Sequence, residues 1–379
     1  MKKVIETSQA IAEAVKICKP AVIPMYPITP QTHIVERLAE FINDGILDSE
    51  MIHVESEHSA ISAALGAEAT GVRTFTATAS QGLALMHEIL YVVSGMRMPV
   101  VMAVANRALS APISIWNDHQ DSIGARDSGW IQLYAESAQE ALDTVIQAYK
   151  ISENRNVLLP SMVCIDGFTL SHVYEPVDIP SQQHVNEFLP KYNPLYKLDP
   201  KKPLTMGPIG FPDSFMYFRK QQQEAMNNVL SLIKGVNIEF KKAFGRSYGN
   251  GLIEGYKMND AKYALVTMGS VSGTARVVVD ELRKKGKKVG LIKIKTFRPF
   301  PERDIINVTK NLKGVAVIDK NISPGYHGAL YSEIRNSLYN SRIKITSFIA
   351  GLGGRDITKN HLINALQNIE KTSKVEWMF

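Results

Sequence analysis

The chain of 379 residues contains very little cysteine. Cys18 and Cys164 are its only two cysteines, and they stand far apart. A disulfide framework or an iron–sulfur cluster requires more cysteines than this, and a CxxC zinc site requires two cysteines separated by only two residues. The sequence therefore excludes a disulfide-stabilised protein and any iron–sulfur cluster held by this chain alone. Because Cys164 lies in an apolar run, we expect it to be a buried core residue.

The sequence also lacks a long hydrophobic run. No segment approaches the roughly 18 consecutive apolar residues that indicate a membrane-spanning helix. The first residues, Met1–Thr7, show no apolar stretch of the kind found in a signal peptide. We therefore expect a cytoplasmic protein that does not associate with a membrane.

Long runs of basic residues are missing as well. The 43 Lys and Arg residues outnumber the 37 Asp and Glu residues, a net charge of +6, but they occur in short pairs such as Lys201-Lys202 and Lys241-Lys242. No basic segment is interleaved with aromatic residues, as a platform for single-stranded nucleic acid would be. We therefore expect no nucleic acid partner and predict that most of these lysines are solvated on helix faces.

The common phosphate and nucleophile motifs are absent too. No GxGxxG follows an apolar run, no GxxxxGK[ST] occurs, and Gly269–Gly273 has Val where a nucleophile elbow needs Ser. His87-Glu88 is followed by Tyr91 where HExxH needs a second His. The Gly351–Gly354 segment is interpreted as a plain strand-to-helix turn. No cofactor can be assigned from a motif of this kind.

What the sequence does contain is the pattern of an α/β protein with parallel sheets flanked by helices. At this length we expect two domains. The first, residues 1–235, includes a proline-rich excursion from Pro176 to Pro212 and a bridging helix at Asp213–Ile233. The second and smaller domain spans residues 236–379. The predicted strands are Ala21–Met25, Arg73–Thr78, Val100–Ala105, Val157–Ile165, Tyr263–Met268, Val289–Ile294, Val315–Ile318 and Ile343–Ile349. The predicted helices are His58–Ala69, Leu83–Val93, Ser137–Ile151, Val271–Lys285, Glu302–Asn311, Gly328–Leu338 and Thr358–Asn368.

Polar residues follow three of the predicted strands of the first domain. In a parallel sheet, ligands bind beyond the carboxyl ends of the strands. Thr29 stands between Pro27 and Pro30, which restrict the backbone and could hold its hydroxyl toward a ligand, although Thr29 could equally be a helix N-cap. Glu57 opens an apolar helix and could complement the helix N-terminus or share a proton with a cofactor nitrogen. The residues alone leave both pairs of interpretations open.

Arg107 directly follows an apolar strand and would be costly to bury without an anion. Its partner is either a carboxylate of the protein or that of a substrate, which arginine binds in bidentate fashion. Downstream, Trp116–Asp121 forms a dense polar stretch in a long loop. The spacing of Asp118, His119 and Asp121 matches no known metal site, so we predict structural hydrogen bonds and no metal.

Taken together, these residues resemble the alpha subunit of pyruvate:ferredoxin oxidoreductase, in its multi-subunit archaeal and bacterial form. The resemblance rests on Tyr26–Thr32, Val54–Ala60, Thr74–Leu83, Asn106–Ala108, Trp116–Asp121, Phe297–Pro301 and Gly351–Asp356. It spans nearly the whole chain and implies two transketolase-like domains, a thiamine diphosphate pyrimidine-binding domain and a C-terminal domain. The chain has no GDG motif, which in this family belongs to a separate beta subunit that grips the diphosphate through Mg²⁺.

The resemblance implies roles for seven residues. Glu57 would hydrogen-bond the aminopyrimidine of the cofactor as the catalytic carboxylate, and Thr29 and Arg107 would hold the substrate carboxylate. The remaining cofactor-binding residues it implies are Pro27, Ile28, Gln81 and Gly82.

The resemblance also implies a reaction and partners. Pyruvate would be decarboxylated and oxidised with coenzyme A as co-substrate, and electrons would pass through [4Fe-4S] clusters on other subunits to ferredoxin. The implied partners are beta, gamma and delta-type subunits. Two alternatives stay open: the same chemistry on a branched-chain acid such as 2-oxoisovalerate, and a non-catalytic subunit that only organises the assembly.

Overall fold

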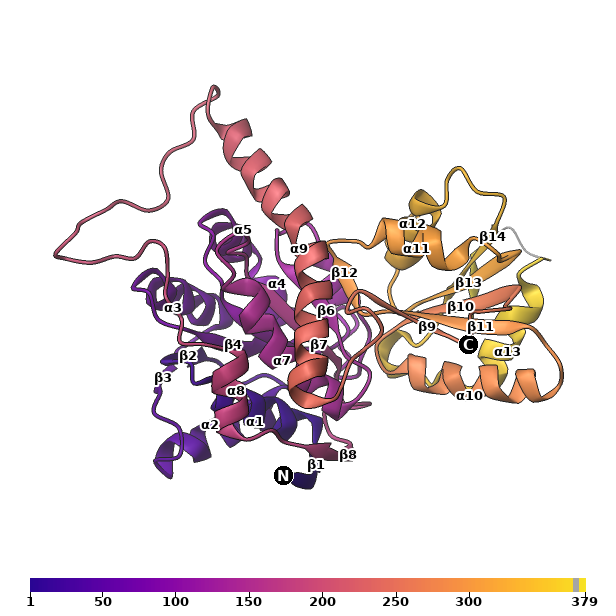
Figure 1. Cartoon of the computed structure of the whole chain (residues 1–379), viewed down its shortest axis with the longest axis horizontal. Helices are drawn as coiled ribbons and strands as arrows, with labels where there is room; N and C mark the ends of the chain where they lie inside the picture. The colour runs from indigo at the N-terminus through magenta and orange to yellow at the C-terminus, as the bar shows by residue number, and fades with distance from the viewer. Residues whose placement is uncertain (371–374) are drawn as a thin grey trace.

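The computed structural model describes residues 1–370 and 375–379. It contains two mainly parallel β-sheets, one in each half of the chain, and both are flanked by helices (Figure 1). This confirms the predicted α/β class. No helix within the described residues has both the length and the apolar character needed to cross a membrane.

The first half of the chain alternates strands and helices as the apolar pattern predicts. Its elements are β1 (Lys2–Glu6), α1 (Thr7–Cys18), β2 (Val22–Met25), α2 (Thr32–Asn43), β3 (Glu50–His53), α3 (Glu57–Ala69), β4 (Phe75–Thr78), α4 (Ser80–Leu85), α5 (His87–Gly95), β5 (Val101–Asn106), α6 (Gln120–Gly124), β6 (Ile131–Tyr134), α7 (Ala138–Ser152), β7 (Ser161–Asp166), β8 (Tyr174–Asp178), α8 (Gln182–Phe188) and α9 (Phe215–Phe244).

The second half repeats the alternation around its own sheet. Its elements are β9 (Ile253–Tyr256), β10 (Tyr263–Met268), α10 (Val271–Lys284), β11 (Val289–Ile294), β12 (Thr296–Arg298), α11 (Glu302–Thr309), β13 (Gly314–Asp319), α12 (Ala329–Ser337), β14 (Lys344–Ile349), the 3₁₀ turn Leu352–Gly354, α13 (Lys359–Asn368) and β15 (Glu376–Trp377). β10 and β11 coincide with the predicted strands, because buried parallel strands are continuous apolar runs.

The first sheet has the strand order β12-β6-β7-β5-β4, and β2 pairs with β3 beside it. A single parallel bridge between Val22 and Thr74 attaches the β2–β3 pair to the edge next to β4. The second sheet has the order β15-β14-β13-β10-β11-β9. In both sheets the loops that follow the parallel strands therefore gather at one edge, where ligands of such folds bind.

Three predictions about boundaries need correction. The single helix predicted at Leu83–Val93 is two helices, α4 and α5, with Met86 between them. The strand predicted from Val157 begins at Ser161, because Leu158 has φ +44° and the residues before Ser161 form a turn. The bridging helix predicted to end at Ile233 continues to Phe244 and stops at Gly245, whose φ of +73° caps it. The domain division after residue 235 stays a prediction, and that position lies within α9.

Helix α9 and the segment before it project from the rest of the molecule (Figure 1). The buried residues of α9 begin at Ala225 and recur at helical spacing to Phe240, so only the C-terminal two thirds of the helix pack on the body. Before Ala225 the helix exposes apolar side chains such as Met216 and Tyr217. The proline-rich excursion therefore lies outside the sheet layers, as its lack of periodicity indicates.

One strand and several ion pairs and hydrogen bonds join the two halves, among them a buried group around Glu140 and a second around Asp166. β12 leaves the second half and pairs antiparallel with β6 of the first sheet. Glu140 on α7 accepts from Lys293 at 2.6 Å and from Lys295 at 3.0 Å. Burial alone would raise the pKa of Glu140, but the two lysines lower it to about 2. The short β12 strand was not predicted, because three residues carry no periodic signal.

Candidate functional site

Glu57 is buried at the start of α3. Ser56 caps this helix, its Oγ accepting from the Ser59 backbone N–H at 3.3 Å. The Glu57 residue is only 6% exposed. Among residues 1–370 and 375–379, no group hydrogen-bonds or ion-pairs with its carboxylate. A capping role for Ser56 leaves the Glu57 carboxylate free to interact with a ligand.

Gly82 allows the Glu57 carboxylate to lie directly against helix α4. A Cβ atom at Gly82 would stand 2.6 Å from Glu57 Oε1 and 2.5 Å from Thr78 Oγ1. Thr78 Oγ1 is buried and has no hydrogen-bond partner among the described residues. Gln81 is half-buried beside it and accepts from Ser80 Oγ at 2.6 Å. The structure thus brings Glu57 and Gly82 together and adds Thr78, which sequence reasoning missed.

The segment from Tyr26 to Pro30 follows β2. Pro27 and Thr29 are exposed and Ile28 is half-buried. Helix α2 begins only at Thr32, with Gln31 at its N-cap, so the interpretation of Thr29 as an N-cap is wrong. Pro27 and Ile28 lie in this segment between β2 and α2.

Arg107 links the segment after β2 to the loop after β5. Its guanidinium donates to the Thr29 carbonyl from Nη1 at 3.0 Å and to the Ser114 carbonyl from Nε at 2.9 Å. The residue is 8% exposed, and no described carboxylate pairs with it. The interpretation of Arg107 as half of an internal ion pair therefore fails, and a buried cation with spare donors suits an anionic ligand.

Asp121 joins the loops that follow β4 and β5. Its carboxylate accepts from the Ser80 N–H at 2.9 Å, the Arg107 N–H at 3.0 Å and Asn106 Nδ2 at 2.7 Å. Burial raises the pKa of Asp121, although these donors oppose the shift. Ser80 Oγ also donates to the Ala108 carbonyl at 2.6 Å. Asp121 was predicted only to make hydrogen bonds, and its backbone partners could not be found from spacing.

The other members of the polar stretch bind different partners. Asp118 accepts from the Gly353 and Gln120 backbone N–H groups at 3.1 and 3.0 Å. His119 Nε2 lies 2.7 Å from Asp166 Oδ1. The predicted structural hydrogen bonds are therefore confirmed. Within the described part of the chain, no group of three or more His, Cys, Asp and Glu side chains is arranged to hold a metal.

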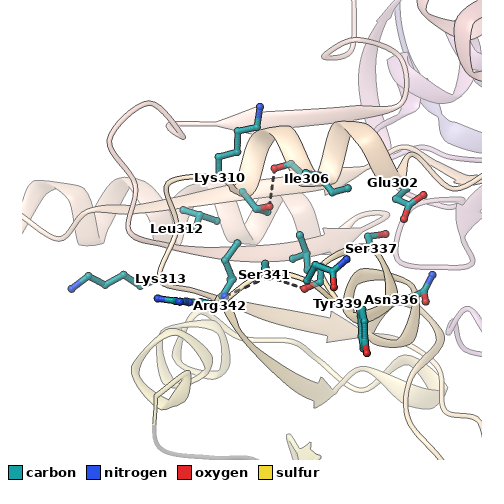
Figure 2. A pocket seen from close by; sticks show the side chains of 14 residues that line it. Glu302, Ile306, Lys310, Leu312, Lys313, Asn336, Ser337, Tyr339, Ser341 and Arg342 are labelled. Atoms are coloured by element: carbon teal, nitrogen blue, oxygen red, sulfur yellow. Dashed lines mark hydrogen bonds between the residues drawn. The ribbon is translucent and has the colours of Figure 1, made fainter.

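A pocket of about 840 Å³ in the second half contains none of the predicted site residues (Figure 2). It lies between α11 and the 336–343 segment. Figure 2 shows Lys310 and Lys313 on its wall extending in different directions, so they do not converge on one anion. The hydrogen bonds there, from Thr309 to Ile306 and from Ser341 to Leu338, are local. The predicted site residues lie instead in the segments that follow the strands of the first half of the chain.

The carboxyl edge of the first sheet fits the aminopyrimidine half of thiamine diphosphate. A carboxylate without a described protein partner can bind a ring nitrogen. Gly82 lets this carboxylate lie close against α4, because a Cβ there would collide with Glu57 Oε1. An α/β protein with such an edge belongs to the class that binds cofactors at the carboxyl ends of parallel strands.

Comparisons with known proteins narrow this class. Residues 13–237 match the thiamine diphosphate-binding family model of pyruvate flavodoxin/ferredoxin oxidoreductases, and residues 261–362 match core domain II of pyruvate:ferredoxin oxidoreductase. Pyruvate synthase subunit PorA of Methanocaldococcus jannaschii is 57% identical over 97% of this chain and 95% of its own. The chain therefore belongs to the pyruvate:ferredoxin oxidoreductase family, as the sequence resemblance predicted.

Further relatives and solved structures agree. PorA of Thermotoga maritima is 45% identical, with 97% of this chain and 95% of its own covered. Ketoisovalerate oxidoreductase subunit VorA of Pyrococcus horikoshii is 43% identical, covering 100% and 98%. The fold matches 2-oxoglutarate:ferredoxin oxidoreductase from Magnetococcus marinus at 18% identity and a TM-score of 0.75, over 97% of this chain and 65% of that one. A split-gene transketolase matches at a TM-score of 0.58 and 12% identity, covering 98% and 100%, which confirms the transketolase-like fold.

Proposed function

We propose that this chain is the subunit of a pyruvate:ferredoxin oxidoreductase that holds the aminopyrimidine half of thiamine diphosphate and binds the carboxylate of pyruvate. Pyruvate, coenzyme A and two oxidised ferredoxins would give acetyl-CoA, CO₂, a proton and two reduced ferredoxins. The observation that carries the proposal is the buried Glu57 carboxylate, which has no described protein partner and faces Gly82. The PorA relatives at 45–57% identity support pyruvate over other 2-oxo acids.

Glu57 is the catalytic carboxylate in this proposal. When bound, thiamine diphosphate supplies the nucleophilic carbon and the electron sink that decarboxylation of a 2-oxo acid requires. The Glu57 carboxylate would hold a proton at a ring nitrogen, in a place from which most water is excluded. Gly82 and Gln81 on α4, with Pro27 and Ile28 from the segment after β2, would form the walls beside the ring.

Arg107 and Thr29 bind the substrate in this proposal. Arg107 has guanidinium donors left after its bonds to two carbonyl oxygens, and the exposed Thr29 side chain lies on the segment to which Arg107 is bonded. A carboxylate bound there would be held in a fixed orientation, which favours attack at the neighbouring carbon. Asp121 would keep the loops of Ser80 and Arg107 in register.

Other subunits complete the site and carry the electrons in this proposal. Cys18 and Cys164 are both buried, and burial raises the pKa of the Cys18 thiol to about 12, so neither suits a cluster ligand. The [4Fe-4S] clusters would therefore lie on gamma or delta-type subunits, and the diphosphate with Mg²⁺ on a beta subunit. The assembly would work in the cytoplasm and reduce ferredoxin.

The test uses the intact complex, purified without oxygen through a tag on this chain. Coenzyme A-dependent reduction of a viologen dye is followed with pyruvate, 2-oxoisovalerate and 2-oxoglutarate. We expect the highest kcat/KM with pyruvate. A preference for 2-oxoisovalerate would keep the chemistry and replace the substrate, whereas no reduction by a complex loaded with thiamine diphosphate would favour the non-catalytic assembly role.

A further inference from the structure

The loop that carries Arg107 is closed on itself. The Ala108 backbone N–H donates to the Trp116 carbonyl at 2.9 Å, and Arg107 Nε donates to the Ser114 carbonyl at 2.9 Å. The position of the guanidinium therefore depends on where residues 114–116 lie. These residues are exposed or half-buried, so the loop has little core packing of its own to fix it.

The residues that follow this loop are bound to the second half of the chain. The Gly354 N–H donates to the Asn117 carbonyl at 2.6 Å, and the Gly353 N–H donates to Asp118 Oδ2 at 3.1 Å. The His119 N–H donates to the Lys320 carbonyl at 2.8 Å. Asn117, Asp118 and His119 are at most 5% exposed, so these bonds are shielded from water.

The turn at Gly351–Gly354 has glycines, without side chains, at the two positions that meet the loop, Gly353 and Gly354. Gly354 has φ +78°, and a Cβ on it would stand 2.4 Å from Trp116 Cβ. Gly353 has φ +58°, but the nearest atom to a Cβ there would be Ser114 Oγ, at 3.5 Å. The two neighbouring glycines thus share a left-handed backbone, and only Gly354 is in contact too close for a side chain.

We propose that Gly354 and Asp118 are positioning residues: the turn of the second half, through Asp118 and Trp116, sets where the Arg107 guanidinium lies and so how the substrate carboxylate is bound. This inference rests on the proposed function, in which Arg107 binds that carboxylate. It assigns to the smaller domain a role in substrate binding, although none of the proposed site residues comes from it. This role gives a physical explanation for the glycines in the Gly351–Asp356 motif.

The test compares Gly354→Ala with Gly353→Asn in the intact complex. Asparagine tolerates the left-handed backbone, so Gly353→Asn adds a side chain to the same turn without the clash. For Gly354→Ala we expect the KM for pyruvate to rise about 10-fold or more, with little change in kcat or in the KM for coenzyme A. Gly353→Asn should stay within about 2-fold of the wild type in all three values.

Asp118→Asn provides a second variant if Gly354→Ala does not fold. Its amide keeps the size of the carboxylate and can accept only one of the two backbone N–H groups, so the KM for pyruvate should rise several-fold. Hydrogen exchange of residues 108–117 gives a readout that needs no substrate. Exchange there should be faster in Gly354→Ala and Asp118→Asn than in Gly353→Asn.

The outcomes separate this inference from the proposed function. If Arg107→Lys raises the KM for pyruvate but Gly354→Ala and Asp118→Asn do not, the positioning role is wrong. If both glycine variants change the KM equally, a general disturbance of the turn is the cause and the inference also fails. If Arg107→Lys itself leaves pyruvate binding unchanged while loop exchange still rises, the proposed function fails and takes this inference with it.

Discussion

The polar groups at the carboxyl edges of the two sheets differ in whether protein groups pair with them. At the edge of the first sheet, the Glu57 carboxylate has no hydrogen-bond donor among the described residues. Arg107 has no carboxylate partner among them. At the edge of the second sheet, Ser270 and Lys320 follow the neighbouring strands β10 and β13, and both bind Asp166 of the first half. A pocket of about 550 Å³ remains beside them, but these two groups on its wall are already paired.

This difference teaches how to interpret a sheet edge. Buried polar groups in proteins nearly always have partners. Where no described protein group pairs with a polar side chain, as at Glu57, the position is open to water, a ligand or another chain. Where the protein supplies a carboxylate itself, as Asp166 does, the same kind of edge becomes a docking surface between domains. The fold alone does not distinguish the two uses.

The largest expected effect is at Glu57, at the edge of the first sheet. Glu57→Gln should assemble normally and lose about 1000-fold in turnover, because the amide cannot hold the proton that the carboxylate holds. The matched control is Glu68→Gln on the same helix: burial raises the pKa of Glu68 to about 8, so it is already protonated at neutral pH. Viologen reduction by both complexes is the measurement. Equal activity of the two variants would contradict the catalytic role.

The next prediction concerns Asp166, which pairs with Ser270 and Lys320 at the edge of the second sheet. Asp166→Asn should destabilise the protein by about 3 kcal/mol at pH 7, because Lys320 loses its buried anion. Burial alone would raise the pKa of Asp166, but Lys320 and His119 lower it well below its usual value. A lowered pKa stabilises the fold above the unfolded pKa near 4, and this stabilisation is lost as the pH falls further.

The pH dependence of the Asp166→Asn effect follows from this sign. The difference in unfolding free energy between wild type and variant should be constant from pH 7 to about 5 and should shrink below about pH 4. Denaturant unfolding at several pH values measures it. A difference that instead grew on acidification would mean that Asp166 is not ionised in the folded protein.

A smaller effect is expected at Arg107. Arg107→Lys removes the planar fork that donates to Thr29 and Ser114 while it faces a ligand, so kcat/KM for pyruvate should fall about 20-fold. The KM for coenzyme A should not change. Arg126→Lys, at a half-buried arginine bonded to the Ile123 carbonyl, is the control. If both lysine variants lost activity equally, the loss would not be specific to Arg107, and its proposed role in binding pyruvate would be contradicted.

The smallest effects come from one glycine at each edge. Gly82→Ala should raise the thiamine diphosphate concentration for half-maximal activity about 10-fold, because the added Cβ collides with Glu57. A Cβ at Gly273 in α10 meets nothing within 4 Å, so Gly273→Ala should stabilise the protein by about 0.5–1 kcal/mol. Cofactor titration and thermal unfolding of both variants would show whether the two edges respond as differently as proposed.

Much of the fold could be predicted because local pattern and tertiary environment agree. The buried strands β10 and β11 are continuous apolar runs, and helix α3 begins where Glu57 was expected to open it. The strand β12 and the full length of α9 could not be predicted, since β12 exists only through its pairing with β6. Short elements that depend on a distant partner leave no periodic signal.

The candidate site residues show the same difference between what local pattern predicts and what depends on distant partners. Glu57, Thr29 and Arg107 could be named from their places after apolar runs and from the resemblance. Their contacts could not: Arg107 donates to the carbonyl of Thr29, 78 positions earlier in the chain. The contacts of Asp121 and Gly354 were missed for the same reason, because each bonds to backbone groups of other loops.

The sequence by itself determined the class of fold and the family, because composition and local motifs carry that information. Only the tertiary structure decided which polar groups at the two sheet edges are paired. That choice depends on through-space distances between segments such as Asp166 and Ser270, 104 positions apart. Such distances are set by the packing of both sheets together and by no single stretch of residues.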